Sequence, residues 1–454
     1  MASTKYEKLV NELTRAIQSG GLAPGAKLPS VRELMRQQQL SLATVTTALT
    51  ILEEQGLIEP KARSGYFVRN EQPSRLRYAD PHFADRESGY HWWPDGDLYP
   101  KERLRKLTAT MIRRYPNLHT FSPRNNNPRL VRQLITRAAE IGCYTTAEEV
   151  LITHGLIEAL SVVLRSLTAP REKVLLQHPT SPVYQAVCDA LKLQPVYITS
   201  NHDEKQFLAN LEQILAEQRE LKTLLLACNF HCPTSDLISL AGKRSLLKIA
   251  GQYDLTIIED DSSGDLHFEN SRPLPLKALD EEKRVIYLSA ATHSFAPGIQ
   301  VGWIFADRQR LQQFEDLKSV STCAVDQLPQ LVLAEFLDQG SHLPHLRKLC
   351  GALKERVQLF ESLMQPCLAA CQGLTGRSGG FNRFLRRSDI AFDHQLEKEC
   401  KTRWPKLFSI EHPFFHFLDS GISANLSLPI DETIAQELRQ FAEFLANLNC
   451  ELAS

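Results

Sequence analysis

From about residue 91 onward, short apolar runs alternate with segments of helical periodicity. The apolar runs occupy residues 150–153, 173–176, 223–227, 255–258 and 285–288, and helical patterns occupy about 155–168, 182–191 and 239–252. This alternation is typical of an α/β fold in which helices cover both faces of a mostly parallel sheet. Ligands of such sheets bind beyond the carboxyl ends of the strands. The residues that follow each apolar run are therefore the candidate site residues.

The length and the charge distribution indicate more than one domain. The 454 residues are too many for one ordinary core, which predicts two or three domains. Residues 1–70 contain nine Lys and Arg against six Asp and Glu, whereas the whole chain has a net charge of −1. A small basic module on an acidic body is compatible with a nucleic-acid contact. We predict domains at 1–70 and 91–454, joined by a polar linker at 71–90.

The sequence carries no sign of a membrane or of an oxidising compartment. Lys5, Glu7 and Lys8 interrupt any apolar run near the N-terminus, and no apolar stretch approaches the length of a membrane span. The ten cysteines are scattered without a CxxC pair, which is typical of reduced thiols. We therefore expect a cytoplasmic protein with no membrane partner.

Residues 1–70 show three helical patterns followed by two short strands. A helix is predicted over 5–18. A second helix starts after Ser30, whose hydroxyl suits an N-cap with Glu33 three residues later. A third helix starts after Ser41, and its predicted buried stripe consists of Val45, Ala48, Leu49 and Leu52. The predicted strands are residues 57–59 and 65–68, with a basic tip at residues 60–64.

The order of these elements resembles the GntR-type winged helix-turn-helix. The matching segments are residues 28–34 (LPSVREL), 44–45 with Ala48, 52–53 with 56–58, and 64–68 (SGYFV). The resemblance implies that the chain binds double-stranded operator DNA, with a helix in the major groove and the wing along the backbone or the minor groove. A three-helix scaffold with solvated charges is the alternative.

The resemblance also implies which side chains meet DNA. Phosphate contacts are expected from Arg32, Lys61 and Arg63, which would position the domain on the duplex. Base contacts are expected from Thr44, Thr46 and Thr47, because small polar side chains at the start of this helix suit the major groove. Ser41 and Gly65 complete the candidate DNA-binding residues.

Residues 91–445 resemble the fold-type I aminotransferase domain, and the whole chain is similar to the MocR subgroup of GntR regulators. The motifs are residues 93–100 (WPDGDLYP), 153–160 (THGLIEAL), 258–261 (IEDD), 296–298 (APG) with 302–303 (GW), 327–330 (QLPQ) and 345–347 (HLR). The resemblance implies a mostly parallel sheet, a smaller C-terminal α+β subdomain and a head-to-tail homodimer. It also implies that the helix N-terminus at Gly155 holds the phosphate of pyridoxal phosphate.

The expected cofactor site departs from this family at several positions. His293 stands where the family has the lysine that forms a Schiff base with pyridoxal phosphate, and an imidazole has no primary amine for that bond. Other family residues are also replaced: the Asn of the NPTG motif by Cys232, the stacking aromatic by Ser181, the phosphate-binding Arg by Gln300, the Tyr after the acidic pair by Ser262 and Ser263, and the carboxylate-binding Arg by Asn425. Asp260, Ser289 and Gly155 remain.

We therefore predict that pyridoxal phosphate does not bind covalently, that no cofactor is present and that the domain is not an enzyme. Each missing contact is worth roughly 1–3 kcal/mol, so their joint loss costs many decades of affinity. Two interpretations of the pocket follow. Either the pocket binds another small effector, or it has collapsed and the domain serves only to dimerise. The candidate effector residues are Gly155, Ser181, Cys232, Asp260, Ser289, His293 and Gln300.

Three alternatives stay open at this point. The first is a regulator that binds pyridoxal phosphate without a covalent link. The second is a cofactor-independent enzyme that uses His293 as a general base. The third is a partner-binding scaffold that regulates without DNA. A metal site formed by His231, Cys232, Asp260 and His293 has a weak spacing signal, and we predict no metal.

Overall fold

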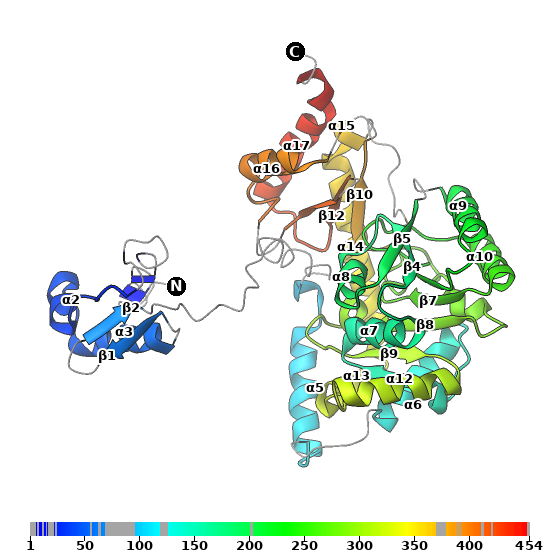
Figure 1. Ribbon diagram of the computed structural model, residues 1–454, viewed down its shortest axis with the longest axis horizontal. Helices are drawn as coiled ribbons and strands as arrows, with labels where there is room; N and C mark the ends of the chain where they lie inside the picture. Colours follow the sequence, from blue (N-terminus) through cyan, green and yellow to red (C-terminus); the bar gives the residue numbers. More distant parts are fainter. Residues whose placement is uncertain are drawn as a thin grey trace. The chain divides into compact units, whose positions relative to one another are not determined.

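The chain forms two compact units, residues 1–87 and 88–454, which are considered separately (Figure 1). The computed structural model describes residues 6, 9–10, 13–14, 16, 22, 25–54, 57–61, 65–68, 96–118, 126–199, 203–368, 378–387, 390, 392–409, 413–418 and 421–451. The whole predicted linker (71–90) and the wing residue Arg63 therefore lie outside the described residues, as does much of the predicted first helix.

The described part of the first unit includes helical residues at 6, 9–10, 13–14 and 16, two further helices and a β-hairpin. Its elements are α2 (Val31–Gln38), α3 (Leu42–Glu54), β1 (Ile58–Lys61) and β2 (Gly65–Val68). The strands are antiparallel, and Lys61 pairs with Gly65. The prediction that Lys61 belongs to the loop at the tip is therefore wrong, because the hairpin ladder extends two residues beyond the apolar run.

Side-chain caps fix where the two helices begin. The Ser30 hydroxyl accepts a hydrogen bond from the backbone N–H of Glu33 (3.3 Å), and the Glu33 carboxylate accepts one from the backbone N–H of Ser30 (2.7 Å). The Ser41 hydroxyl accepts from the backbone N–H of Thr44 in the same way (3.3 Å). Gln39 is left-handed (φ 52°) and turns the chain between the helices. The unit has its own core, which includes Leu9, Leu13, Leu34, Val45, Leu49, Leu52 and Ile58.

The second unit is built on a seven-stranded sheet of order β3-β9-β8-β7-β6-β4-β5. The strands are β3 (Val150–Thr153), β4 (Lys173–His178), β5 (Gln194–Thr199), β6 (Thr223–Leu226), β7 (Thr256–Asp260), β8 (Val285–Ala290) and β9 (Gly302–Phe305). All neighbours are parallel except β9, which is antiparallel to both β3 and β8. The predicted α/β class with a mostly parallel sheet is confirmed.

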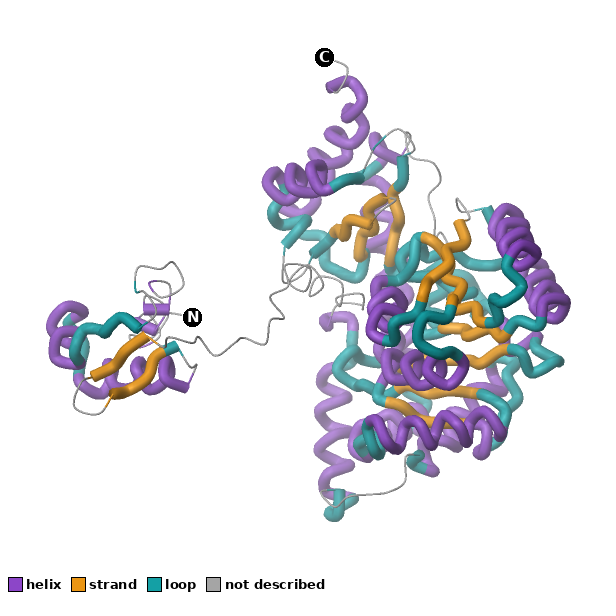
Figure 2. The backbone as a smooth tube through the Cα atoms, viewed as in Figure 1, coloured by secondary structure: helices purple, strands orange, loops and turns teal. Residues whose placement is uncertain are grey.

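Helices cover both faces of this sheet (Figure 2). They are α5 (Lys101–Arg114), α6 (Pro128–Glu140), α7 (Gly155–Leu167), α8 (Pro182–Ala190), α9 (Glu204–Glu217), α10 (Leu240–Tyr253), α11 (Ala291–Ser294), α12 (Arg308–Ser321) and α13 (Gln327–Asp338), with short 3₁₀ turns at Gly96–Leu98, Ala147–Glu149 and Leu276–Leu279. Successive strand residues point to opposite faces. Ile258 accordingly packs in the core of α7, α8 and α12, and its neighbour Ile257 packs in the core of α9 and α10.

The C-terminal part of this unit is a smaller α+β subdomain. Its antiparallel sheet has the order β10-β12-β11, with β10 (Asn382–Leu385), β11 (Phe415–Leu418) and β12 (Gly421–Asn425). The accompanying helices are α14 (His342–Leu363), α15 (Gln365–Leu368), α16 (His394–Arg403) and α17 (Glu432–Glu451). Among the described residues, no helix combines the length and the apolar character that a membrane span requires.

Candidate functional site

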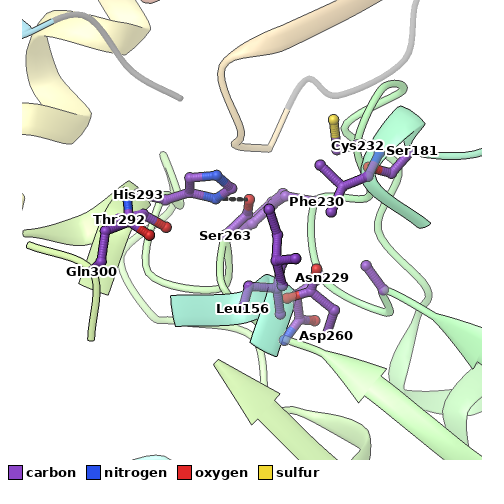
Figure 3. Close-up of a pocket in the computed structure, with 13 residues that line it drawn as sticks. Leu156, Ser181, Asn229, Phe230, Cys232, Asp260, Ser263, Thr292, His293 and Gln300 are labelled. Carbon is purple, nitrogen blue, oxygen red and sulfur yellow. Dashed lines mark hydrogen bonds between the residues drawn. The ribbon is translucent and has the colours of Figure 1, made fainter. Parts of the chain in front are cut away.

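A cavity lies where the strands of the large sheet end (Figure 3). Its lining consists of Leu156, Ile157, Ser181, Val183, Ala227, Asn229, Phe230, Cys232, Asp260, Ser263, Thr292, His293 and Gln300. Asp260 is the last residue of β7, and His293 lies in α11 directly after β8. Ser181 caps α8 through its hydroxyl, which accepts from the backbone N–H of Val183 (3.3 Å). The carboxyl edge of the sheet therefore gathers these side chains around one space.

Five of the seven predicted pocket residues line this cavity, namely Ser181, Cys232, Asp260, His293 and Gln300. Gly155 is not among the lining residues but precedes Leu156, which is. Ser289 is also not among them, and its hydroxyl lies 3.5 Å from the carbonyl oxygen of Asp261. Asn229, Phe230 and Thr292 line the cavity but were not predicted from the sequence, although each lies within three residues of a predicted site residue.

His293 contacts Ser263 and Phe381 at the cavity wall. Its Nδ1 lies 3.0 Å from Oγ of Ser263, and its ring meets the Phe381 ring edge-on with centroids 5.3 Å apart. Figure 3 shows the imidazole directed toward Ser263. The side chain therefore offers an imidazole, and no primary amine, at this point of the cavity.

Asp260 is anchored through both carboxylate oxygens. The Tyr184 hydroxyl donates to Oδ2 (2.7 Å), and the backbone N–H of Ser262 donates to Oδ1 (3.0 Å). Burial nevertheless raises the pKa of Asp260, since desolvation outweighs these hydrogen bonds. Burial and the neighbouring carboxylate also raise the pKa of Tyr184 well above its usual value. The hydrogen bonds from Tyr184 and Ser262 therefore hold the Asp260 carboxyl group in one orientation at the end of β7.

Gln300 lies over the N-terminus of α7. A Cβ atom built on Gly155, whose φ is +71°, would lie 2.7 Å from Oε1 of Gln300. The Gln300 amide nitrogen donates to the carbonyl oxygen of Pro297 (2.7 Å), which fixes the orientation of the carboxamide. The space in front of this helix end is thus partly filled by an uncharged side chain of the protein.

A buried ion pair supports the same helix end. The backbone N–H of His154 donates to Oε2 of Glu158 (2.6 Å), so this carboxylate already satisfies one N–H at the helix start. Nζ of Lys318, which is fully buried, lies 3.3 Å from Oε1 of Glu158. The positive charge of Lys318 is therefore already balanced by Glu158.

Cys232 offers a protonated thiol to the cavity. Burial and the nearby Asp260 carboxylate raise its pKa, and a hydrogen bond with Ser181 offsets only part of this effect. Because the thiolate is the form that attacks and binds metals, this cysteine is a poor nucleophile and a poor metal ligand. Among the described residues, no group of three or more His, Cys, Asp and Glu side chains is placed to hold a metal ion.

The candidate DNA-binding residues gather on α2, α3 and the hairpin of the first unit. Arg32, Ser41, Thr46 and Thr47 are exposed, and Thr44 is half-buried. The hydroxyls of Ser41 and Thr44 lie 2.8 Å apart, and that of Thr47 donates to the carbonyl oxygen of Ala43 (2.9 Å). These hydroxyls therefore make hydrogen bonds within or at the start of α3, and the side chains of Ser41 and Thr47 are still exposed to solvent.

The hairpin carries a basic pair that includes a residue missed by the sequence analysis. Nζ of Lys61 lies 4.8 Å from the centroid of the Phe67 ring, and Nζ of Lys27 lies 6.0 Å from it. Gly65 has a φ of +99°, which explains a glycine at the start of β2. Lys27 precedes the second helix by four residues, so only the folded structure brings it to the same aromatic ring as Lys61.

Family comparisons agree with both units. Residues 97–382 match the family described as aminotransferase class I and II, and residues 5–68 match the family described as bacterial regulatory proteins, gntR family. The fold and the helix-turn-helix together define a transcriptional regulator with an aminotransferase-like domain. The chain belongs to the aminotransferase class I and II family and carries a gntR-family domain in front of it. This organisation is consistent with the MocR subgroup.

Two curated relatives that the chain matches over most of their length are named HTH-type transcriptional regulators. The chain is 28% identical to the uncharacterized HTH-type transcriptional regulator YdcR of Escherichia coli, over 78% of this chain and 80% of the relative. It is 26% identical to the regulator YjiR of the same organism, over 97% of this chain and 98% of the relative. An archaeal alanine:glyoxylate aminotransferase superposes with a TM-score of 0.69 at 22% identity, over 79% of this chain and 89% of that chain. The last likeness shows the fold alone.

Proposed function

We propose that this protein binds operator DNA as a homodimer, and that its aminotransferase-like domain is neither a transaminase nor a covalent sensor of pyridoxal phosphate. The domain instead dimerises and senses a different small ligand. The observation that carries this proposal is the imidazole of His293 in the cavity, at the position where the family's Schiff base requires a primary amine. Operator binding is supported by the exposed Arg32, Thr46 and Thr47 on the helix-turn-helix.

The cavity lining does not suit pyridoxal phosphate. None of the described lining residues is a Lys or an Arg, so no ammonium or guanidinium group there is available for the phosphate. The carboxamide of Gln300 lies at the helix end where a phosphate would have to sit. A dianion placed there would face an uncharged side chain and a helix end already bonded to Glu158.

The first test is retention of pyridoxal phosphate. The purified protein is incubated with the cofactor and desalted, and its visible absorption is recorded beside the variants His293→Lys and His293→Gln. We expect no retained chromophore in the wild type or in His293→Gln, because neither side chain forms an imine. A chromophore in His293→Lys would show that the missing amine limits covalent binding. A chromophore that the wild type retains would refute the proposed loss of the cofactor.

The second test concerns DNA binding by Arg32. Binding of the full chain to a generic duplex is followed by fluorescence anisotropy at several salt concentrations. Removal of one phosphate contact from each subunit of the proposed homodimer is expected to lower the slope of log K against log salt by about two. Arg32→Ala should show that decrease, and Arg219→Ala, an exposed arginine of the second unit, should not. An unchanged slope in Arg32→Ala would contradict the docking geometry.

One contact favours a second candidate function, a cofactor-independent enzyme. The 3.0 Å approach of His293 Nδ1 to Ser263 Oγ pairs a base with a hydroxyl inside a cavity. Such a pair would make the serine a nucleophile. Hydrolysis of an activated ester that is lost in both Ser263→Ala and His293→Gln would support this candidate.

A further inference from the structure

Resting on the proposed function, we propose that the cavity takes a small single-ring compound that carries a protonated nitrogen or an N–H donor and lacks a phosphate. The charges of the lining point to this class. Asp260 is the one acidic residue among the described lining residues, and none of them is a Lys or an Arg. Leu156, Val183 and Phe230 add apolar walls. A flat apolar ring with one donor group matches both features.

The acid group at the cavity floor is held in place for such a donor. Tyr184 and the backbone of Ser262 each donate to one oxygen of Asp260, at 2.7 and 3.0 Å. Each carboxylate oxygen has two lone pairs, so acceptor capacity remains for a ligand. A buried carboxylate is costly without a counter-charge, and no described lining residue is a Lys or an Arg that would supply a permanent one. A protonated nitrogen on the ligand would offset that cost.

The opposite end of the cavity disfavours a phosphate. Oε1 of Gln300 would lie 2.7 Å from a Cβ atom on Gly155, and the carboxamide is tied to Pro297. The His154 N–H already donates to Glu158, which places a carboxylate at the same helix end. A phosphate would have to displace the carboxamide and approach that carboxylate. A ligand without phosphate avoids both costs.

The size of the cavity limits the ligand to one ring. Its volume is about 70 Å³. A volume of about 15 Å³ holds one water molecule, so the space equals roughly five waters. A substituted five- or six-membered ring suits such a space, whereas a ring with a phosphate arm needs additional room at the Gln300 end.

The test compares pyridoxamine with pyridoxamine 5′-phosphate, because these compounds differ only in the phosphate and neither forms an imine with a lysine. Calorimetric titration of the full chain should show pyridoxamine binding at least tenfold more tightly. Asp260→Asn should weaken pyridoxamine binding more than tenfold, whereas Asp189→Asn, an exposed aspartate of α8, should leave it unchanged. Gln300→Arg should shift the preference toward the phosphate by supplying a cation.

Three results would overturn the ligand class: tighter binding of the phosphate by the wild type, no binding of pyridoxamine, or an unchanged affinity in Asp260→Asn. Near-UV circular dichroism checks that Asp260→Asn is folded. If this variant does not fold, the preference of Gln300→Arg between pyridoxamine and its 5′-phosphate still tests the ligand class. Two other results would contradict the proposed function: a chromophore retained by the wild type, or no DNA binding by the wild-type full chain. The two failures are therefore distinguishable.

Discussion

The hydrogen bond from Tyr184 to Asp260 links the first turn of α8 to the end of β7. Both side chains are buried, and the donor lies 2.7 Å from the acceptor. Tyr184→Phe would leave a buried carboxylate with one partner fewer. We expect this change to lower the free energy of unfolding by about 1–3 kcal/mol and to raise the pKa of Asp260 further. Urea unfolding of both proteins measures the first effect.

Tyr197→Phe provides a matched control for that measurement. Tyr197 is 41% exposed, and its hydroxyl donates to Gln185 at the protein surface. Removal of this hydroxyl is expected to change the free energy of unfolding by less than about 0.5 kcal/mol. If the two variants lost equal stability, the Asp260 contact would have no special role.

Some residues of the cavity could be predicted from sequence because they follow strands. Asp260 and His293 end or follow apolar runs, and the carboxyl edge of a parallel sheet collects such residues. Asn229 and Thr292 also follow apolar runs, but they were not predicted because the sequence does not give the direction of a side chain in the segment after a strand. Gln300 was predicted as a replaced phosphate ligand, but its contact with the helix end depends on the carboxamide rotamer.

At the scale of elements, the strands that are continuous apolar runs were predictable, including the edge strand β3, whereas β5 and β9 were not. β7 and β8 are continuous apolar runs because both of their faces are covered. β5 lies at the sheet edge and alternates buried and exposed residues around Tyr197, so it lacks such a run. β9 has four residues, starts with Gly302 and runs antiparallel, which the β/α alternation does not reveal.

Asp265 joins three elements of the second unit. Its carboxylate lies 2.6 Å from Arg137 of α6, 2.7 Å from Arg272 of the segment after β7, and 3.7 Å from His342 of α14. Burial acts to raise the pKa of Asp265, but Arg137 and Arg272 outweigh it and hold the pKa well below its usual range. The ionised form is therefore the one that stabilises the fold.

Asp265→Asn should lower the free energy of unfolding by about 3–5 kcal/mol near neutral pH, because Arg137 and Arg272 both lose the buried carboxylate that they share. A depressed folded-state pKa contributes stability above the unfolded pKa of about 3.9, and this contribution is lost as the pH falls toward the folded value. The difference between wild type and variant should therefore be constant above about pH 5 and shrink below pH 4. Urea unfolding across this pH range measures it.

Glu102→Gln is the control for Asp265→Asn. Glu102 and Arg105 form an exposed pair, with 2.9 Å between Oε2 and the guanidinium nitrogen. Exposed pairs contribute about 0–1 kcal/mol, so this variant should lose little stability. A difference for Asp265→Asn that persisted unchanged to pH 3 would contradict the assigned role of its charge.

At the scale of the whole molecule, each unit has an apolar core of its own. Leu49 of α3 is 1% exposed within the core of the first unit, and Leu211 of α9 is fully buried within a core of the second. Units with separate cores are expected to unfold separately. The DNA-binding surface and the ligand cavity should then respond to different core mutations.

Leu49→Ala and Leu211→Ala test this separation as a matched pair. Each change deletes the same buried atoms and should lower the stability of its own unit by about 2–5 kcal/mol. The first unit is small, so its free energy of unfolding is expected to be low. Leu49→Ala should therefore abolish DNA binding at a temperature where the affinity of the cavity for its ligand, measured by calorimetric titration, is unchanged. Leu211→Ala should lower the temperature at which the second unit unfolds, while the wing and helix-turn-helix keep their own transition. Two transitions in differential scanning calorimetry, each moved by only one variant, are the expected result. A single transition moved equally by both variants would mean that the units fold as one cooperative body.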